Sequence, residues 1–128
     1  IKLEEIADAS GNGRYEFESD GENIRIGKML KAIVKDKTNK VPGSIVSAKF
    51  HNAVARIILD ISRKIRKKSG IKAVALSGGV FQNKFLTKKT INLLNNEGFE
   101  VLQHRQVPCT DAGISLGQAV IAANLSLR

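Results

Sequence analysis

The sequence predicts an α/β domain of 128 residues in which short strands alternate with helices. Three observations predict this class: a long stretch with apolar residues at helical spacing, an apolar run that ends in Ser-Gly-Gly, and a helix-strand-helix pattern after that turn. The expected element order is α-ββ-α-α-β-α-β-α. At this length the chain forms one domain or part of one.

Composition narrows the class of protein. A hydrophobic fraction of 42% permits a packed core, while no apolar run reaches the length of a membrane span. We therefore expect a soluble, cytoplasmic protein. The single cysteine, Cys109, excludes an internal disulfide and a cysteine-cluster metal site. Because the chain begins with Ile1 rather than Met, we expect it to be processed or cut from a longer polypeptide.

Three short elements are expected before the long helix. Residues 3–9 have the spacing of a helix tail, which a Ser-Gly-Asn-Gly sequence would end. Residues 14–26 alternate around a polar turn, which predicts a β-hairpin. A short helix should follow over residues 27–37. Four apolar side chains should face inward from it: Met29, Leu30, Ile33 and Val34.

The longest helix should run from Pro42 or Gly43 to Ser69, because proline is tolerated in a first helical turn. Gly70 should end it in the C′ position. Apolar residues recur along it at intervals of three and four and predict its inward face: Ile45, Ala48, Val54, Ala55, Ile58, Ile61 and Ile65.

The chain is centred on a strand and a glycine turn. Residues 73–76 are all apolar, as expected for a strand covered on both faces. At Gly78 and Gly79 no Cβ keeps a ligand away from the backbone, and a turn that feeds a helix start gathers N–H groups suited to a phosphate. An ordinary strand-to-helix turn without a ligand is the alternative.

A second strand and turn should lie beside the first. A helix is expected from Asn83 to about Asn95, then a strand over residues 99–102, a loop, and a last helix that begins at residue 111. The inward side of that last helix should hold Ile114, Leu116, Ala119, Val120 and Ala123. Because the two strands should be parallel, the turns at 77–79 and 110–113 should open on one sheet edge, where ligands bind in such folds.

The formal net charge is +9, and the segment 63–72 is strongly basic. Its cations are Arg63, Lys64, Arg66, Lys67, Lys68 and Lys72. Such a cluster can bind nucleic acid or be the solvated end of a helix, where cations complement the dipole. We favour the helix end, because no aromatic residues interleave to stack on bases.

Several ordered motifs resemble the C-terminal end of the hydrogenase-maturation carbamoyltransferases, the HypF family. They are Phe50-His51-Asn52, the run from Val74 to Asn83, the run from Gly98 to Val101, Val107-Pro108 with Asp111, and the run from Gly113 to Ala119. The resemblance covers most of the chain. The tRNA threonylcarbamoyl-transfer enzymes are related to this family.

The resemblance implies that residues 1–128 are the C-terminal subdomain of a carbamoyl-transfer domain. The implied fold is half of an actin-like ATPase (ribonuclease H-like) domain, a mixed sheet with helices packed on it, with the N-terminal half absent from this chain. The implied chemistry uses carbamoyl phosphate and ATP, through carbamoyl adenylate, to carbamoylate the C-terminal cysteine of a HypE-like partner. That reaction serves synthesis of the cyanide ligand of nickel-iron hydrogenase.

Carried over residue by residue, Gly78, Gly79 and Asn83 resemble the nucleotide-contacting loop, and Asp111 resembles the ligand of a divalent metal such as Fe, Zn or Mg. In the family a His-x-x-x-His pair in the first half of the domain completes this metal site, and no such pair occurs here. This sequence also departs from the family at Ala112, where the family usually has glycine. That departure puts the shape of the turn in doubt, since alanine adopts positive φ at a greater cost.

The same candidate residues could instead have purely structural roles. Asp111 can cap the last helix, and Asn83 can bond locally in a first helical turn. We expect His51 to be a packing residue, Ser77 to shape the turn, and Cys109 to be a bystander, since a neighbouring carboxylate disfavours a thiolate.

The first functional hypothesis is therefore that this chain forms one wall of the nucleotide and metal cleft of a carbamoyltransferase and is inactive by itself. One alternative is a stand-alone nucleotide-binding module that works with a separate partner chain. Another is a basic tRNA-binding fragment that uses the segment 63–72. We expect no membrane partner, and a homodimer through the exposed half-domain face is a further alternative.

Overall fold

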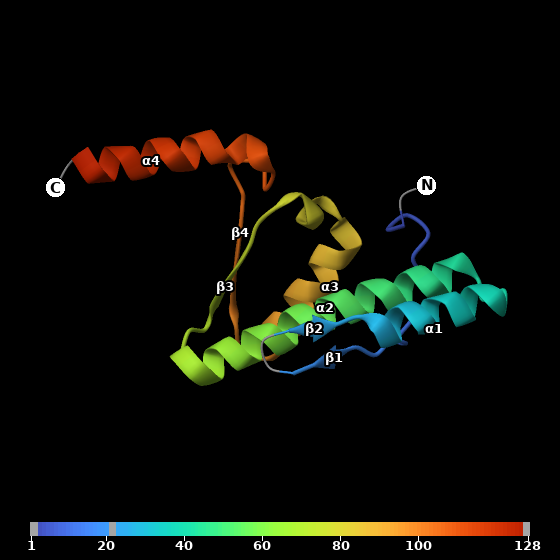
Figure 1. Cartoon of the computed structure of the whole chain (residues 1–128). Coiled ribbons are helices and arrows are strands. Elements are labelled where there is room, and N and C mark those ends of the chain that lie inside the picture. The colour runs from blue at the N-terminus through green and yellow to red at the C-terminus, as the bar shows by residue number, and fades with distance from the viewer. Residues whose placement is uncertain (1–2, 21–22, 127–128) are drawn as a thin grey trace.

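The computed structural model describes residues 3–20 and 23–126. Within these ranges the chain forms four α-helices and two small sheets, which confirms the α/β class (Figure 1). The elements are β1 (Glu18–Ser19), β2 (Ile24–Arg25), α1 (Gly27–Thr38), α2 (Gly43–Ser69), β3 (Ala73–Leu76), the 3₁₀ turn η1 (Gly79–Gln82), α3 (Lys84–Asn96), β4 (Glu100–Gln103), the 3₁₀ turn η2 (Asp111–Gly113) and α4 (Ile114–Ser126). The strands pair in two separate sheets, β1 with β2 and β3 with β4, rather than in one mixed sheet.

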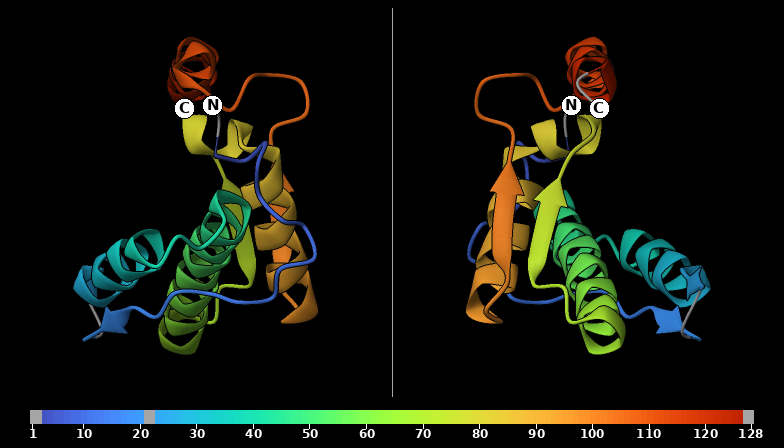
Figure 2. Two further views of the ribbon diagram at one scale, coloured as in Figure 1. Left: turned by 90° about the vertical axis from the view of Figure 1, so that its right-hand side faces the viewer. Right: turned by 90° about the vertical axis from the view of Figure 1, so that its left-hand side faces the viewer.

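Helix α2 is the longest element, and both α1 and α3 contact it. Its 27 residues extend about 40 Å at the rise of an α-helix. It ends as expected at Gly70, which has φ 74° and donates its N–H to the Arg66 carbonyl at 2.8 Å. Helix α1 runs antiparallel beside its first half, and α3 packs against it from another side (Figure 2).

The buried face of α2 differs in part from the expected one. Its buried residues are Val46, Ser47, Ala48, His51, Ala53, Ala55, Leu59 and Ser62. The predicted inward residues Ile45, Ile61 and Ile65 are instead 40% or more exposed. Small side chains explain the difference, because they let neighbouring backbone come close: a Cβ on Gly11 would lie 3.2 Å from the Ala48 Cβ.

Two clusters of buried residues lie along α2. One joins the N-terminal segment, α1 and the start of α2 through Tyr15, Met29, Val46 and Ala53. The other joins the end of α2, α3 and the β3–β4 sheet through Leu59, Leu76, Leu94 and Phe99. The second cluster fixes the sheet edge on which the candidate site lies.

Strands β3 and β4 are parallel, as predicted, with Ala73 opposite Glu100 and Leu76 opposite Gln103. Helices α2 and α3 cover one face of this sheet, and the other face is open (Figure 2). Only Leu76 of β3 is buried, so the expectation of a strand covered on both faces was wrong for the described chain. Alternate side chains of a strand point to opposite faces, and no helix lies over the second one.

The N-terminal predictions were partly wrong. Residues 3–6 form turns rather than a helix tail, while residues 1–2 lie outside the described ranges. The hairpin exists but pairs only Glu18 with Arg25 and Ser19 with Ile24, and residues 21–22 of its turn are also outside those ranges. On α1, Met29 is buried and Ile33 half-buried, but Leu30 and Val34 are exposed, because α1 meets α2 along only one side.

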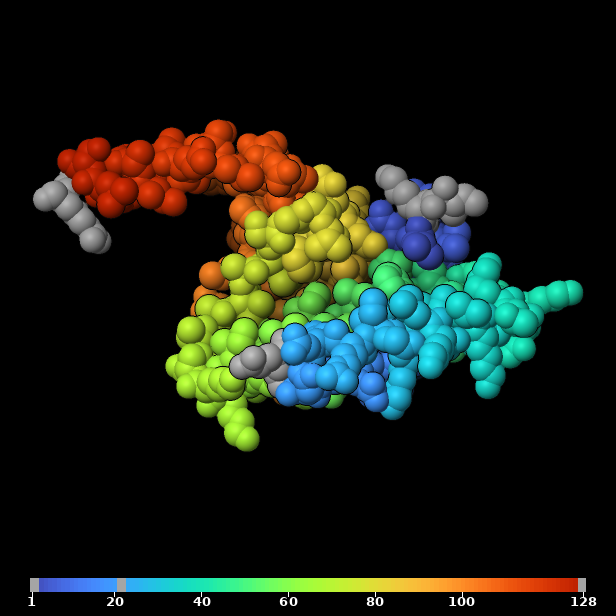
Figure 3. All heavy atoms as spheres, viewed as in Figure 1, coloured from blue at the N-terminus to red at the C-terminus, as the bar shows by residue number. Residues whose placement is uncertain are grey.

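Helix α4 projects away from the rest of the molecule (Figures 1 and 3). Its predicted inward side is exposed throughout: Ile114, Leu116, Ala119, Val120 and Ala123. Its large apolar side chains are each at least half exposed. Among the described residues no helix is both long and apolar enough to cross a membrane.

Candidate functional site

The glycine turn follows β3 directly. Gly78 has φ 100° and ψ 157°, a conformation that an L side chain rarely adopts, so glycine is required there. A Cβ built on Gly78 or Gly79 would meet no atom within 4 Å. The backbone of the turn is therefore open on the side that a ligand would approach.

The two predicted turns meet at the carboxyl edge of the sheet. The Gly78 N–H donates to the Cys109 carbonyl at 2.7 Å, and the Ser77 hydroxyl lies 2.9 Å from Nε2 of His104. These contacts join segments about 30 residues apart in sequence, as the predicted parallel strands require. The convergence of the two turns is confirmed, and Ser77 helps to hold the turns together, in keeping with its expected structural role.

The turn at residues 110–113 tolerates Ala112. Lys40 is the sole non-glycine residue with positive φ in the described ranges, so Ala112 adopts an ordinary conformation within η2. Glycine is needed one residue later instead, because a Cβ on Gly113 would lie 2.9 Å from the Pro108 carbonyl oxygen. The departure at Ala112 therefore leaves the shape of the turn unstrained.

Asn83 is the N-cap of α3. Its Oδ1 accepts the Leu86 N–H at 2.8 Å, and its Nδ2 lies 2.8 Å from Nε2 of His51. The Asn83 N–H also donates to the Val80 carbonyl, which closes η1. Through its side chain and its backbone together, Asn83 thus links the glycine turn, the start of α3 and α2.

His51 is a packing residue, as expected, but it also orients Asn83. Its ring is 2% exposed and makes edge contacts with Phe50 and Phe85. Its Nδ1 lies 2.8 Å from the Ser47 carbonyl, which can only accept, so Nδ1 carries the proton. Nε2 of the neutral ring is then an acceptor, and Asn83 Nδ2 donates to it.

Asp111 lies exposed at the start of η2. Within the described chain its side chain makes no capping hydrogen bond, so the helix-cap alternative was wrong. Nor do the described residues contain a group of three or more His, Cys, Asp or Glu side chains that could hold a metal ion. One carboxylate fits a single position of a metal's coordination shell, and other ligands would have to come from outside these residues.

The remaining candidates have structural roles. Cys109 is a partly buried free cysteine whose carbonyl receives the Gly78 N–H. In the basic segment, Arg63 binds the Glu97 carboxylate through two nitrogens, and Arg66 donates to the Glu97 carbonyl at 2.7 Å. Arg66 also covers the Phe99 ring at 4.1 Å. Part of the cluster therefore fastens the end of α2 to the turn after α3, which supports the helix-end interpretation.

The local hydrogen bond expected of Asn83 is confirmed by its cap on Leu86, but sequence reasoning missed two features of the site: the His51–Asn83 bond and the Ser77–His104 contact. An asparagine directly before a helical apolar pattern is a recognised N-cap signal, which is why the local bond could be expected. The two contacts join residues 32 and 27 positions apart, and no local pattern predicts them.

Comparison with known proteins identifies the family. Residues 1–118 match the family model described as "Carbamoyltransferase, Kae1-like Domain, second subdomain". The chain belongs to the HypF carbamoyltransferase family. A HypF carbamoyltransferase of Synechocystis is 37% identical over 90 residues, which is 70% of this chain and 11% of that protein. A solved structure of full-length HypF in a phosphate- and nucleotide-bound form matches with a TM-score of 0.89 and 41% identity, over 96% of this chain and 17% of that one.

The relatives extend to tRNA-modifying enzymes. A tRNA N6-adenosine threonylcarbamoyltransferase of Thermosipho melanesiensis is 30% identical over 117 residues, which is 86% of this chain and 36% of that enzyme. This chain therefore spans between about a tenth and about a third of the length of these curated relatives.

Proposed function

We propose that this chain is the C-terminal subdomain of a carbamoyl-transfer domain and supplies one wall of its nucleotide cleft. The observation that carries the proposal is the hydrogen bond from Gly78 to Cys109, which places the glycine turn beside Asp111's loop at one sheet edge. Gly78 and Gly79 let the nucleotide approach the backbone, Asn83 contacts it, and Asp111 supplies one ligand to a divalent metal. The match to a nucleotide-bound HypF structure supports this assignment.

Gly78 contributes to ligand binding through its conformation and its lack of a side chain rather than by donating a hydrogen bond to the ligand. The Gly78 N–H is already used by the Cys109 carbonyl, so Gly78 contributes its φ of 100° and the lack of a side chain. Asn83 retains one N–H and one lone pair after its bonds to His51 and Leu86. It can therefore contact a ligand while it stays fixed in orientation.

The proposed reaction of the whole enzyme forms carbamoyl adenylate from carbamoyl phosphate, ATP and water, with release of inorganic phosphate and pyrophosphate. The terminal cysteine thiol of a HypE-like protein then attacks the carbamoyl carbon: a C–S bond forms, the C–O bond to AMP breaks, and the thiol proton is released. A metal at Asp111 would supply charge stabilisation near the phosphates. This chain's own residues position the nucleotide and leave the opposite side open.

The exposed surfaces support a missing second wall. The bare face of the β3–β4 sheet and the apolar helix α4 flank the glycine edge, and such surfaces are normally covered. We propose that the N-terminal half of the domain covers them, either from the same polypeptide or from a separate partner chain. A homodimer that uses the same surfaces is the competing arrangement. In either case the chain alone should not turn over carbamoyl phosphate.

The test compares two glycine substitutions in the 128-residue chain. Gly78→Val and Gly98→Val both place a side chain at positive φ in open space, but Gly98 precedes β4 at the opposite end of the sheet. When ATP and Mg²⁺ are added, the amide NMR signals of residues 77–83 and 109–113 should shift. Gly78→Val should abolish these ligand-induced shifts, and Gly98→Val should keep them. Adding the N-terminal half of a HypF domain should tighten binding at least tenfold. Equal binding by both variants would contradict the proposed cleft wall.

A further inference from the structure

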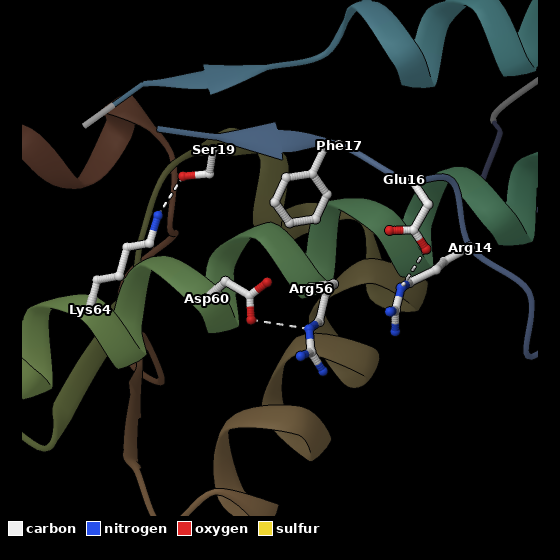
Figure 4. A pocket seen from close by; sticks show the side chains of 7 residues that line it. All are labelled: Arg14, Glu16, Phe17, Ser19, Arg56, Asp60 and Lys64. Carbon is white, nitrogen blue, oxygen red and sulfur yellow. Dashed lines mark hydrogen bonds and ion pairs between the residues drawn. The ribbon is translucent and has the colours of Figure 1, made fainter. Parts of the chain in front are cut away.

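Two adjoining hollows lie along α2, away from the glycine edge, and share Arg14 and Arg56. The larger has a volume of about 370 Å³, lies between the hairpin segment and α2, and contains Glu16 and Asp60 (Figure 4). The smaller has a volume of about 190 Å³ and reaches α3. Its lining is Asn12, Arg14, Asn52, Arg56, Lys89 and Leu93, and none of these six described residues is acidic.

Both arginines approach a carboxylate through Nε. Arg14 Nε lies 3.5 Å from Glu16 Oε1, and Arg56 Nε lies 3.1 Å from Asp60 Oδ1. Within the described ranges, no hydrogen bond engages the Nη groups of either arginine. Figure 4 shows both guanidinium ends turned away from the hairpin, and both arginines also line the smaller hollow.

The remaining lining is prearranged and positive. Asn52 Nδ2 donates to the Gly11 carbonyl at 2.9 Å and to the Gly13 carbonyl at 2.8 Å, which fixes the loop that carries Arg14. Arg56 follows Asn52 by one turn of α2. Lys89 forms no ion pair within the described chain and lies 5.6 Å from the Phe85 ring centroid, so its charge is available.

The nearest carboxylates offset only part of this charge, because Glu16 and Asp60 pair with the two arginines while Lys89 has no such partner within the described chain. Glu16 and Asp60 lie on the side of the larger hollow. The charge of Arg56 helps to lower the pKa of Glu97, but the Glu97 carboxylate is bound by Arg63. Three cations thus face the smaller hollow, which is below the usual 300 Å³ or so of a site for a drug-sized ligand.

We propose that the Arg14–Arg56–Lys89 hollow binds a phosphate group, either inorganic phosphate or the terminal phosphate of a small ester. Two guanidinium forks with free Nη donors match the oxygens of a tetrahedral dianion, and an ammonium adds a point charge. The site is separate from the glycine turn and does not depend on the function proposed for it.

The experiment titrates the 128-residue chain with inorganic phosphate at constant ionic strength and follows backbone and arginine Nε–H signals by NMR. Saturable shifts should appear at residues 12–14, 52–56 and 89. Arg56→Gln and Lys89→Gln should each weaken binding at least tenfold. Arg25→Gln is the matched control for Arg56→Gln, because Arg25 is also an ion-paired arginine but lines neither hollow.

Lys89→Gln keeps the test decisive if Arg56→Gln unfolds, since among the described residues Lys89 has no ion pair that its loss would break. Shifts that do not saturate, or equal affinity of Lys89→Gln and the unaltered chain, would overturn the proposal. An oligonucleotide without terminal phosphates forms the second arm and should bind more weakly than phosphate. If it binds more tightly, with a steep salt dependence, the surface tracks a phosphodiester backbone and the phosphate-group site is wrong.

Discussion

Substitution Asn83→Ala should destabilise the protein more than the loss of an ordinary helix cap. The cap on Leu86 contributes about 1 kcal/mol. The same change removes the donor to His51 Nε2, and a buried acceptor without a partner costs about 1–3 kcal/mol. We therefore expect the free energy of unfolding to fall by about 2–4 kcal/mol.

Urea unfolding followed by far-ultraviolet circular dichroism measures this change. Asn92→Ala is the control, because Asn92 is an exposed asparagine on the same helix and its loss should change stability by less than about 0.5 kcal/mol. A loss of about 1 kcal/mol or less for Asn83→Ala would refute the role of the His51 bond and leave only a cap.

A double-mutant cycle isolates that bond. His51→Phe keeps a ring between Phe50 and Phe85 but removes the acceptor for Asn83. Combined with Asn83→Ala, it should cost less than the sum of the single changes, with a coupling of about 0.5–1.5 kcal/mol. Additive effects would show that the two side chains do not interact.

Two further predictions concern the core and the response to acid. Leu59→Ala should lose about 2–5 kcal/mol of stability in urea unfolding, whereas Ile61→Ala on the same helix should lose far less, because Leu59 is 1% and Ile61 40% exposed; equal losses would place the buried face where the sequence predicted it. Hydrogen bonds from Lys49 and then Tyr15 hold the pKa of the Asp36 carboxyl below its usual value, so its stabilisation is present above about pH 4 and is lost as the pH falls through the lowered pKa. Asp36→Asn should flatten the fall in unfolding free energy between neutral pH and about pH 3, and Tyr15→Phe should flatten it partly; unchanged curves would contradict this role.

Elements marked by strong local signals were predictable. The long helix ends at Gly70, and a turn before β4 is made by Gly98; both adopt positive φ, of 74° and 75°, which glycine adopts at little cost. The parallel pairing of β3 and β4 followed from the strand-helix-strand order, because that connection returns the chain in the same direction. These features depend on neighbouring residues and on chain connectivity.

Burial was predicted less well, because it depends on which surfaces meet. Bulky isoleucines were expected inside α2, yet Ser47 and Ala48 are buried at positions where backbone passes close by. The Ser47 hydroxyl donates to the Leu3 carbonyl at 2.5 Å, a contact 44 residues apart that no helical period contains. Ile61 and Ile65 stay 40% and 49% exposed, so the described chain covers them only in part and their apolar character overstated their burial.

The candidate site shows the same division between local and distant causes. Its glycines were recognisable because Gly78 must adopt φ 100°, a requirement that the amino-acid type itself records. The orientation of Asn83 is set by His51, whose own proton position is set by the Ser47 carbonyl one turn earlier on α2. The proposed nucleotide contact of Asn83 and its cap on the Leu86 N–H therefore do not compete. The hydrogen bond to His51 uses one amide hydrogen of Asn83 and leaves the other free.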